Sequence, residues 1–490
     1  MLASAVTTRR RPEKDDTAKD DTAKEDTGQF ASCYEVDHMS PHAAQRSNTV
    51  ILFGITGDLA YKKLLPALYE LTVDGIRPRV IGVARSEGDD ETMRARARKA
   101  LAHHDSTFVD DLVSRITYVR GDYTGSETYD RLAKAVGEHE PVPVSFLAIP
   151  PALFDDVATG LAEVGLDRGR IVVEKPFGRD LASAQELNEI LHRHFTEDAI
   201  YRIDHFLGKE AVMNMLVFRF ANAMLEGVWN RHHISRVTIT MAESFDIAGR
   251  GGFYDEVGAI RDVVQNHLLQ MIALLAMEPP ADEAADSLRV EKVKVLRAMR
   301  PGDPARSVRG QYLGYLEEAG VEPDSQTETF VALELFIDSW RWSGVPFAIR
   351  AGKGMAETIT EAVVEFRPPP TAMFGGVDKM AGSSILRFRM KPDNAITLTM
   401  QAKTPGDEMI SAPVDLSVDY GEALGGAGPD PYERLIGDAL AGDSRLFAHQ
   451  DGVEQAWRIV DPLLDIGDPV LQYSRGGWGP PEANAISPMT

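Results

Sequence analysis

One short stretch of the sequence combines side chains suited to binding an anion and moving a proton. Asp204, His205 and Lys209 lie within six residues and offer a carboxylate, a titratable ring and a fixed cation. Since His205 and Lys209 are four positions apart, a helix would place them on one face, where they would hold one phosphate. Charge-assisted hydrogen bonds to such a group are worth about 1.5–3 kcal/mol each. A polar helix start with ordinary salt bridges is the alternative.

A second stretch places a histidine in an apolar pattern. Val263, His267 and Met271 are spaced four apart, so a helix would carry them on one face. Most histidines in this setting are hydrogen-bonded core residues. The alternative is a general base, because imidazole has a reference pKa of about 6.5 and a neighbouring carboxylate fixes its tautomer and stabilises its cation. The local pattern leaves both interpretations open.

The elements that would position these residues begin with a strand, a glycine turn and a helix. The apolar run at 48–53 predicts a buried strand, and it leads directly into the turn Gly54-Ile55-Thr56-Gly57-Asp58-Leu59-Ala60 and a helical pattern. Glycines in such a turn let the backbone approach a pyrophosphate, which is bound at the helix N-terminus. The spacing is G-x-x-G-x-x-A and not the commoner G-x-G-x-x-G, so an ordinary strand-to-helix turn is the alternative.

Strands and helices then alternate along the first part of the chain. Apolar runs predict strands at 79–84, 116–119, 144–149 and 171–174, and a helical pattern covers 155–164. This alternation predicts an α/β Rossmann-like dinucleotide-binding domain over residues 48–205. Ligands of such sheets bind beyond the carboxyl ends of the strands, which is where Lys175 falls. A surface lysine at a strand end is the alternative.

Arg85 bears on the choice of cofactor. It follows the second strand, where NAD-binding folds usually carry an acid that contacts the ribose hydroxyls. An arginine there suits the 2′-phosphate of NADP, whereas Glu87 would repel that phosphate if it pointed inward. NADP is therefore the expected cofactor, and NAD is the second option.

The hydrophobic pattern of the sequence changes after about residue 205. Long alternating runs occur at 237–243, 329–342, 361–366, 384–390 and 395–401. Such runs are typical of an antiparallel sheet, so residues 206–490 are expected to form an α+β domain with a large, mainly antiparallel sheet.

Residues 1–47 differ from both of these parts. DDTAK occurs twice in tandem at 15–24, and large apolar residues are rare. Such a composition cannot offset the entropy of ordering, which predicts a disordered tail. Three arginines at 9–11 are not followed by an apolar segment, so an export signal is not expected.

The overall composition limits the class of protein. The chain has 490 residues with 52 Lys and Arg against 75 Asp and Glu, a net charge of −23. This acidity argues against nucleic acid as the main partner. The one cysteine, Cys33, cannot form an internal disulfide and fits a reducing cytosol. No apolar run reaches the roughly 18 residues that cross a membrane. A cytoplasmic soluble enzyme is the expected class.

Several segments of the sequence resemble the glucose-6-phosphate dehydrogenase family and occur in the same order as in that family. The matching segments are GITGDLAYKKLLPALYEL, VVEKPFGRDL, YRIDHFLGKE, GRGGFYDEVGAIRDVVQNHLLQMIALLAM and VPFAIRAGK. The resemblance continues through PDSQTETF, IDSWRW, YERLIGDALAGD and EQAWRIVDPLL, and it covers roughly residues 48 to 481. RIDHFLGKE and RDVVQNH are the most specific of these segments.

The resemblance implies an enzyme that oxidises C1 of β-D-glucose 6-phosphate to 6-phosphoglucono-δ-lactone and passes hydride to NADP. This is the first step of the oxidative pentose phosphate pathway. His267 matches the family's base and Asp204 its carboxylate partner. The residues that match substrate ligands are Lys63, Lys175, His205, Lys209, Glu243, Asp262 and Lys353. The residues that match the cofactor site are Gly54, Thr56, Gly57, Asp58, Leu59, Arg85, Asp122, Tyr123 and Lys175. No metal is implied, and a homodimer or homotetramer is expected by analogy.

Several positions depart from the family pattern. Phe206 replaces a tyrosine, Thr358 a basic residue, Lys391 a glutamine and Tyr61 a lysine. Losing one charged contact weakens binding by about 1.5–3 kcal/mol, so an altered substrate affinity is expected unless Lys391 compensates. Apolar residues such as Ile359 and Val363 stand where mammalian relatives bind a second, structural NADP, and that site is not expected here.

These departures keep two alternatives open. One is a paralogue that acts on another sugar phosphate in a specialised pathway. The other is a non-catalytic homologue, against which the presence of both His267 and Asp204 speaks.

Overall fold

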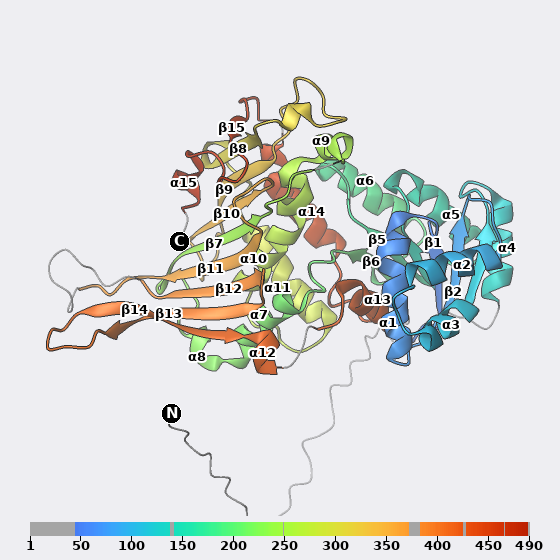
Figure 1. The fold of residues 1–490 in the computed structure, drawn as a ribbon, viewed down its shortest axis with the longest axis horizontal. Helices are drawn as coiled ribbons and strands as arrows, with labels where there is room; N and C mark the ends of the chain where they lie inside the picture. Colours follow the sequence, from blue (N-terminus) through green and yellow to red (C-terminus); the bar gives the residue numbers. More distant parts are fainter. Residues whose placement is uncertain are drawn as a thin grey trace, which may run out of the picture. The chain divides into compact units, whose positions relative to one another are not determined.

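The computed structural model describes residues 45–137, 142–247, 249–371, 383–424, 428–464 and 466–488. Two sheets organise this part of the chain (Figure 1). The predicted tail lies outside the described residues up to position 44. At its end, Ser47 is buried and its N–H donates to the carbonyl of Leu440 at 2.8 Å.

Within the described residues, the first sheet has six parallel strands in the order β3-β2-β1-β4-β5-β6. The strands are β1 (Thr49–Phe53), β2 (Arg79–Ala84), β3 (Ile116–Arg120), β4 (Val144–Leu147), β5 (Arg170–Glu174) and β6 (Ile200–Ile203). The order reverses between β1 and β4, the point where sheets of this kind bind a dinucleotide. The predicted Rossmann-like fold is confirmed.

Helices cover both faces of this sheet because its strands are apolar on both sides. Val50 and Leu52 pack toward α1 (Leu65–Val73), α2 (Asp90–Ala100) and α3 (Ser106–Ser114). Ile51 and Phe53 pack toward α4 (Ser126–Val136), α5 (Phe154–Glu163) and α6 (Leu181–His192). A late helix, α13 (Pro431–Ala441), joins the α1 side and packs against α1.

The second sheet has nine strands among the described residues, in the order β14-β13-β12-β11-β7-β10-β9-β8-β15. The strands are β7 (Ile234–Ala242), β8 (Ser307–Tyr312), β9 (Phe330–Phe336), β10 (Pro346–Gly352), β11 (Ile359–Phe366), β12 (Ile385–Lys391), β13 (Ala395–Lys403), β14 (Ser411–Asp419) and β15 (Leu471–Tyr473). Most neighbours are antiparallel, but β10 pairs with β7 and β15 with β8 in parallel. The expected large, mainly antiparallel sheet is confirmed.

One expected run ends earlier than its pattern indicated. The alternation at 329–342 predicted a long strand, whereas β9 ends at Phe336. The chain turns at Ser339–Gly344: the N–H of Ser343 donates to the carbonyl of Ser339 at 2.9 Å, and Gly344 has a φ of 84°. Trp342 nevertheless stays buried, because its indole N–H donates to the carbonyl of Ala276 at 2.7 Å.

Helices pack beside the large sheet (Figure 1). They are α7 (Glu210–Ala221), α8 (Ala223–Glu226), α9 (Gly251–Ala259), α10 (Leu269–Ala276), α11 (Ala285–Ala298), α12 (Tyr420–Leu424), α14 (Gln450–Val460) and α15 (Ala483–Ile486). Every residue of α10 is buried, and this helix packs against α7 and α11. Between α9 and α10 the chain forms a π-helix, η4 (Ile260–Leu268), and a second π-helix, η1 (Ala60–Leu64), precedes α1. In the described residues, no helix has the length and apolar character needed to cross a membrane.

Candidate active site

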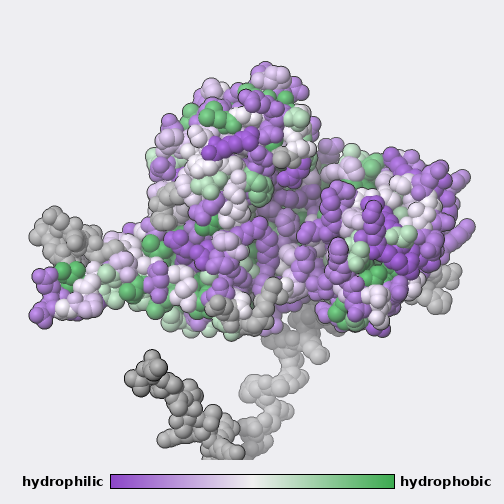
Figure 2. Space-filling model, in the orientation of Figure 1, coloured by the Kyte–Doolittle hydropathy of each residue, from purple (hydrophilic) through white to green (hydrophobic). Residues whose placement is uncertain are grey.

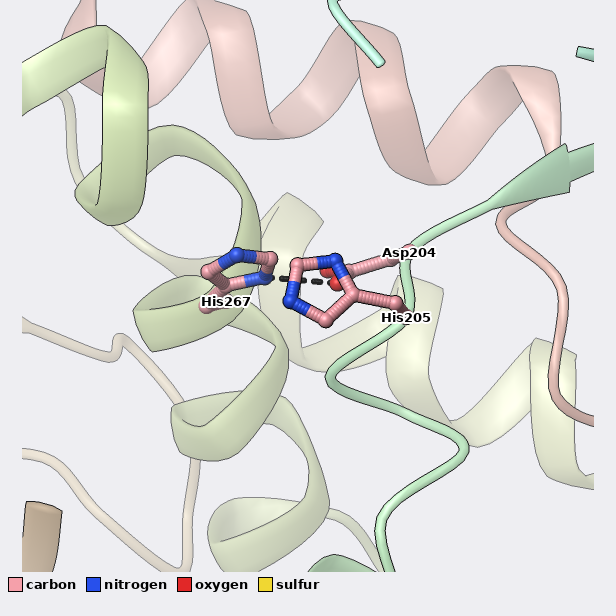
Figure 3. Close-up of side chains that lie close together, drawn as sticks. All are labelled: Asp204, His205 and His267. Carbon is pink, nitrogen blue, oxygen red and sulfur yellow. Dashed lines mark ion pairs between the residues drawn. The ribbon is translucent and has the colours of Figure 1, made fainter. Parts of the chain in front are cut away.

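The central pair of the site is His267 and Asp204. Asp204 follows the last residue of β6, and His267 lies in η4. Nδ1 of His267 lies 2.6 Å from Oδ1 of Asp204 (Figure 3), and their side chains are only 5% and 3% exposed. The backbone N–H of Phe206 also donates to Oδ1 of Asp204, at 3.0 Å. The carboxylate is therefore held in place and orients the imidazole ring through Nδ1.

The other ring nitrogen of His267 faces a lysine. Nζ of Lys175 lies 3.1 Å from Nε2 of His267 and donates to the carbonyl of Asp262 at 3.0 Å. An ammonium only donates, so Nε2 carries the lone pair and Nδ1 carries the proton. Nε2 is therefore the atom that can accept a proton.

The electrostatic environment keeps this pair in the states that a base needs. Burial lowers the pKa of His267 against the attraction of Asp204, and Lys175 lowers it further. Burial opposes ionisation of Asp204, but His267 and Lys175 together hold its pKa below the usual range. Near neutral pH the ring is therefore neutral beside an ionised carboxylate.

A second cluster of charges lies next to the pair. Nζ of Lys353 is 2.6 Å from Oε2 of Glu243 and 3.3 Å from Oδ2 of Asp262, and Nζ of Lys175 is 3.7 Å from Oδ1 of Asp262. Burial opposes ionisation of Asp262, but the two lysines lower its pKa. Two carboxylates and two ammonium groups thus alternate, an arrangement suited to binding several hydroxyl groups at fixed positions.

These groups line one cavity of about 320 Å³. The cavity also receives side chains from β7, β11, β12 and α9, so both halves of the chain contribute to it. Its lining residues that are charged or histidine are Lys175, His205, Lys209, Glu243, Arg250, Asp262, His267, Lys353 and Lys391. Cations outnumber carboxylates in this lining, so the cavity favours an anion although the chain as a whole is acidic.

His205 and Lys209 line this cavity, but they do not share a helix. Residues 205–208 form a turn, and α7 begins only at Glu210. Burial lowers the pKa of His205 to about 3, with His267 adding to the effect. Burial and the neighbouring Lys391 lower the pKa of Lys209 to about 8. The prediction that His205 and Lys209 share one face of a helix is therefore wrong. A turn brings the two side chains to the same cavity.

The helical-face prediction for His267 is also wrong in detail. η4 is a π-helix, whose hydrogen bonds run from i to i+5, so side chains four apart drift around its axis. Val263 lines the cavity with His267, whereas Met271 lies in α10 and is fully buried in the core. π-helices are frequent at functional sites because they re-aim a side chain in this way.

Phe206, one of the departures, lies beside the His267–Asp204 pair. Its ring is stacked 5.1 Å from that of His267, and Nζ of Lys209 lies 4.5 Å from its centroid. Phe206 is buried, so its ring forms an apolar wall and a cation–π contact where a tyrosine would add a hydroxyl.

Thr358 and Lys391, two other departures, both line the cavity. The hydroxyl of Thr358 accepts the N–H of Ser244 at 3.0 Å and lies 2.9 Å from the Ser244 hydroxyl. In the part of the chain that the structure describes, Lys391 has no carboxylate within ion-pair distance, and it is close enough to Lys209 to lower the pKa of Lys209. Lys391 therefore adds a cation to the same side of the cavity.

Lys63, expected at the substrate site, is not among the cavity-lining residues. It lies in η1, half-exposed, with its Nζ 3.7 Å from Oδ2 of Asp430 at the start of α13. Its role in substrate binding stays a prediction.

Two residues near the site were not identified from the sequence. The ring of Tyr432 is nearly parallel to that of His205, at 6.3 Å, and its hydroxyl is hydrogen-bonded to Glu174. Burial raises the pKa of Glu174 to about 7, although Tyr432 and Lys175 oppose this. Glu174 was detectable as the acid beside Lys175, but no local spacing links Tyr432 to a residue so distant in sequence.

Asp204, His205 and His267 also form a group whose potential ligand atoms all lie within 4.8 Å of one another (Figure 3). These three side chains could serve as the ligands of a metal ion. However, one imidazole nitrogen of His267 is already paired with Asp204, and the other faces the Lys175 ammonium. Lysine thus supplies the positive charge at this point, and the expectation of a site without metal stays a prediction.

The predicted cofactor turn lies at the carboxyl end of β1. Gly54 has a φ of 82°, and a Cβ there would lie 2.3 Å from the carbonyl oxygen of Ala148, so the turn requires glycine. The N–H of Gly57 donates to the carbonyl of Gly54 at 2.8 Å, and Asp58 pairs with Lys62 at 2.9 Å. Thr56 accepts the hydroxyl of Ser86 at 3.2 Å, which ties this turn to the end of β2. Leu59 packs against the core below.

Arg85 lies at the same edge of the sheet. Its guanidinium is 3.2 Å from Oδ1 of Asp122 and 5.4 Å from the ring centroid of Tyr123. Glu87 pairs instead with Arg120 at 3.0 Å, so its charge is partly neutralised. The residues predicted for the 2′-phosphate side therefore lie together, and Tyr123 is buried beneath them.

Arg96 in α2 also holds the turn, and it was not identified from the sequence. Its guanidinium donates to the carbonyl of Thr56 at 2.6 Å and lies 5.0 Å from the ring centroid of Tyr61. Tyr61, a departure from the family pattern, thus packs on a cation that fixes the cofactor turn.

Two family models match the chain. The model for "Glucose-6-phosphate dehydrogenase, NAD binding domain" matches residues 51–214, and that for "Glucose-6-phosphate dehydrogenase, C-terminal domain" matches residues 216–488. A curated relative, glucose-6-phosphate 1-dehydrogenase 1 of Mycobacterium tuberculosis, is 45% identical over 446 residues, which are 90% of this chain and 94% of the relative. Glucose-6-phosphate 1-dehydrogenase of Mycolicibacterium smegmatis is 42% identical over 469 residues, covering 89% and 95%.

Solved structures agree with the sequence comparisons. A crystal structure of glucose-6-phosphate 1-dehydrogenase from Mycobacterium avium superposes with a TM-score of 0.84 at 42% identity, covering 90% of this chain and 97% of that one. A glucose-6-phosphate dehydrogenase in complex with its substrate glucose-6-phosphate gives a TM-score of 0.85 at 37% identity, covering 92% and 99%.

Proposed function

The chain belongs to the glucose-6-phosphate dehydrogenase family, and on that premise we propose that its cavity oxidises β-D-glucose 6-phosphate at C1 to 6-phosphoglucono-δ-lactone. The protein is an oxidoreductase with the family's dinucleotide-binding and C-terminal domains. The observation that carries the proposal is the buried His267–Asp204 pair, in which Nε2 of His267 faces Lys175 in a cavity lined by cations.

In the proposed reaction, Nε2 of His267 takes the proton of the C1 hydroxyl. Asp204 keeps the other nitrogen protonated beforehand and stabilises the imidazolium that forms. As the C1–O bond becomes a carbonyl, the hydrogen on C1 departs with its electron pair. When bound, NADP supplies the acceptor for that hydride, so the proton and the hydride leave the substrate by separate routes.

The polar groups of the cavity divide between the two ends of the substrate. His205, Lys209 and Lys391 are proposed to bind the phosphate, with His205 donating as a neutral ring because its pKa is about 3. Lys175, Glu243, Asp262 and Lys353 are proposed to hold the sugar hydroxyls and align C1 with His267. Lys63 supports binding from outside this group.

The residues at the edge of the parallel sheet fit NADP. The glycine turn at Gly54 and Gly57 would receive the pyrophosphate at the start of η1, with Thr56, Asp58 and Leu59 completing the turn. Arg85, beside Asp122 and Tyr123, would bind the 2′-phosphate. Lys175, which matches a family residue that also reaches the cofactor, would lie at the nicotinamide end. NAD use is a second option, because Arg85 is already paired with an acid.

The domain division and assembly complete the proposal. We propose that residues 48–205 bind the dinucleotide and that residues 206–490 bind the substrate and form a homodimer or homotetramer. Apolar side chains are interspersed over the β13–β14 hairpin (Figure 2), and exposed residues there are Met400, Met409, Val414, Leu416 and Val418. Light scattering would show a multiple of 53.8 kDa. The single cysteine fits a cytoplasmic location, which cell fractionation checks.

Turnover tests the proposed function directly. Nicotinamide reduction is followed with glucose 6-phosphate, other hexose phosphates and free glucose, each with NADP and with NAD. We expect the highest kcat/KM with glucose 6-phosphate and NADP. Preference for another hexose phosphate would indicate the paralogue that acts elsewhere, and no turnover with any of them would indicate a non-catalytic homologue.

A further inference from the structure

Glu328 is a buried carboxylate that the proposed chemistry does not use. It lies two residues before β9 and is only 6% exposed. Its Oε1 accepts the N–H of Ile260 at 3.0 Å, and its backbone carbonyl accepts the N–H of Ala259 at 2.9 Å. One residue thus binds two successive N–H groups where η4 begins. Among the described residues, no lysine or arginine lies within ion-pair distance of Glu328, so these N–H groups are its main partners.

The chain at this point is shaped to fit that carboxylate. Gly258, the second-last residue of α9, interrupts the helical path with a φ of 69° and a ψ of 173°. A Cβ at Gly258 would lie 2.6 Å from Oε1 of Glu328. The glycine therefore lets the backbone turn and also leaves room for the carboxylate against the first free N–H groups of the helix, where a negative charge is favourable.

The helix that Glu328 holds carries two residues of the active site. Asp262 is two positions after Ile260, and His267 is seven positions after it. Both depend on the place where η4 starts, because the first N–H groups of a helix have no partner within the helix and are held here by Glu328.

The same segment also holds the lysine that faces Asp262. The carbonyl of Thr329, next to Glu328, accepts the N–H of Lys353 at 2.9 Å. Nζ of Lys353 then reaches Oδ2 of Asp262 at 3.3 Å. Residues 328 and 329 therefore connect the start of η4 with the end of β10, and they set the distance between the two halves of this ion pair.

We propose that Glu328 is a positioning residue for the dehydrogenase reaction, which fixes the start of η4 relative to Lys353 and so keeps Asp262 and His267 aligned with the substrate. The inference rests on the proposed function. Glu328 acts through geometry: an acceptor at the position of Oε1 matters more than the charge.

Three variants separate geometry from charge. Glu328→Gln keeps an acceptor at the same reach without the charge, Glu328→Asp keeps the charge but is one methylene shorter, and Glu328→Ala removes both. Glu334→Gln is the matched control, because Glu334 lies on β9 and pairs with Arg236 and Arg306, away from η4. The readouts are kcat and KM for glucose 6-phosphate, the pH profile of kcat/KM, and hydrogen exchange of a peptide that covers residues 259–268.

We expect Glu328→Ala and Glu328→Asp to lower kcat by about tenfold to a hundredfold, since small misplacements of catalytic groups have effects of this size. The acid limb of the pH profile shifts with them, because His267 moves relative to Asp204 and Lys175. Exchange at 259–268 accelerates. Glu328→Gln stays close to wild type in all three measurements, and Glu334→Gln changes none of them.

The proposal would be overturned if Glu328→Asp were active and Glu328→Gln were impaired. It would also be overturned if both of these variants had the wild-type kcat and pH profile. If Glu328→Ala does not fold, this comparison of the two remaining variants still decides. Failure of the proposed function gives a different result, because the wild-type protein would then show no turnover with glucose 6-phosphate. The positioning role alone would be refuted if hydrogen exchange at 259–268 were unchanged in Glu328→Asp.

Discussion

Nζ of Lys175 lies 3.1 Å from Nε2 of His267, the nitrogen that we assign as the proton acceptor. Lys175 follows β5 of the parallel sheet, and His267 lies in η4, which packs against β10 of the second sheet. The contact therefore joins the parallel-sheet part and the large-sheet part of the chain at the proposed proton acceptor. A cation at this position disfavours protonation of the ring before the substrate arrives.

This relationship predicts the direction of a pH shift. Lys175 lowers the pKa of His267, so Lys175→Gln should raise that pKa. Because the base must be neutral to accept a proton, the acid limb of the kcat/KM profile should move to higher pH, with a lower maximum from the lost substrate contact. The profile is measured for the variant and for Lys294→Gln, a control at an exposed lysine paired with Glu291. A shift to lower pH in Lys175→Gln would contradict the assignment of Nε2.

Lys391 should contribute to substrate affinity. It adds a cation beside Lys209 in the cavity, whereas Thr358 offers only a hydroxyl. Lys391→Gln should raise KM for glucose 6-phosphate about tenfold or more with little change in kcat, since a charged contact is worth about 1.5–3 kcal/mol. The control is Lys403→Gln at the end of β13, whose Nζ binds only backbone carbonyls. An unchanged KM in Lys391→Gln would mean that this lysine does not reach the phosphate.

Arg85 should determine the preference between the two dinucleotides. Arg85→Ala removes the cation proposed for the 2′-phosphate, so KM for NADP should rise about tenfold to a hundredfold while KM for NAD changes little. Arg98→Ala is the matched control, because Arg98 lies in the last turn of α2 and pairs with Asp110. Equal losses with NADP and NAD in Arg85→Ala would place the 2′-phosphate elsewhere.

Five of the six strands described in the dinucleotide-binding part were predictable because their signals are local, whereas β6 was not predicted. The strand at 79–84 has the predicted bounds, and its neighbours differ by one or two residues at an end. Apolar runs that end at glycine or proline identify such strands without knowledge of the rest of the fold. β14 was missed because residues 413–418, six of its nine, are exposed, so it has no buried face to create an alternating pattern.

The site was predictable only in part, because its geometry depends on contacts between distant segments. The resemblance identified His267 and Asp204, but the local pattern could not, since a π-helix breaks the four-residue spacing. Tyr432 packs beside His205, and Glu328 binds the start of η4; both contacts arise from tertiary packing, which no spacing encodes. The cluster at 204–209 had the right residues for a phosphate site, although a turn and not a helix positions them.

The most direct test of the account is the effect of His267→Asn on chemistry and on binding, measured separately. Asparagine keeps a polar side chain but cannot accept the proton at the position of Nε2. We predict that kcat falls by about a hundredfold to ten-thousandfold, while the Kd of glucose 6-phosphate stays within about threefold of wild type. Turnover close to wild type in a folded His267→Asn variant would contradict the assignment of His267 as the base.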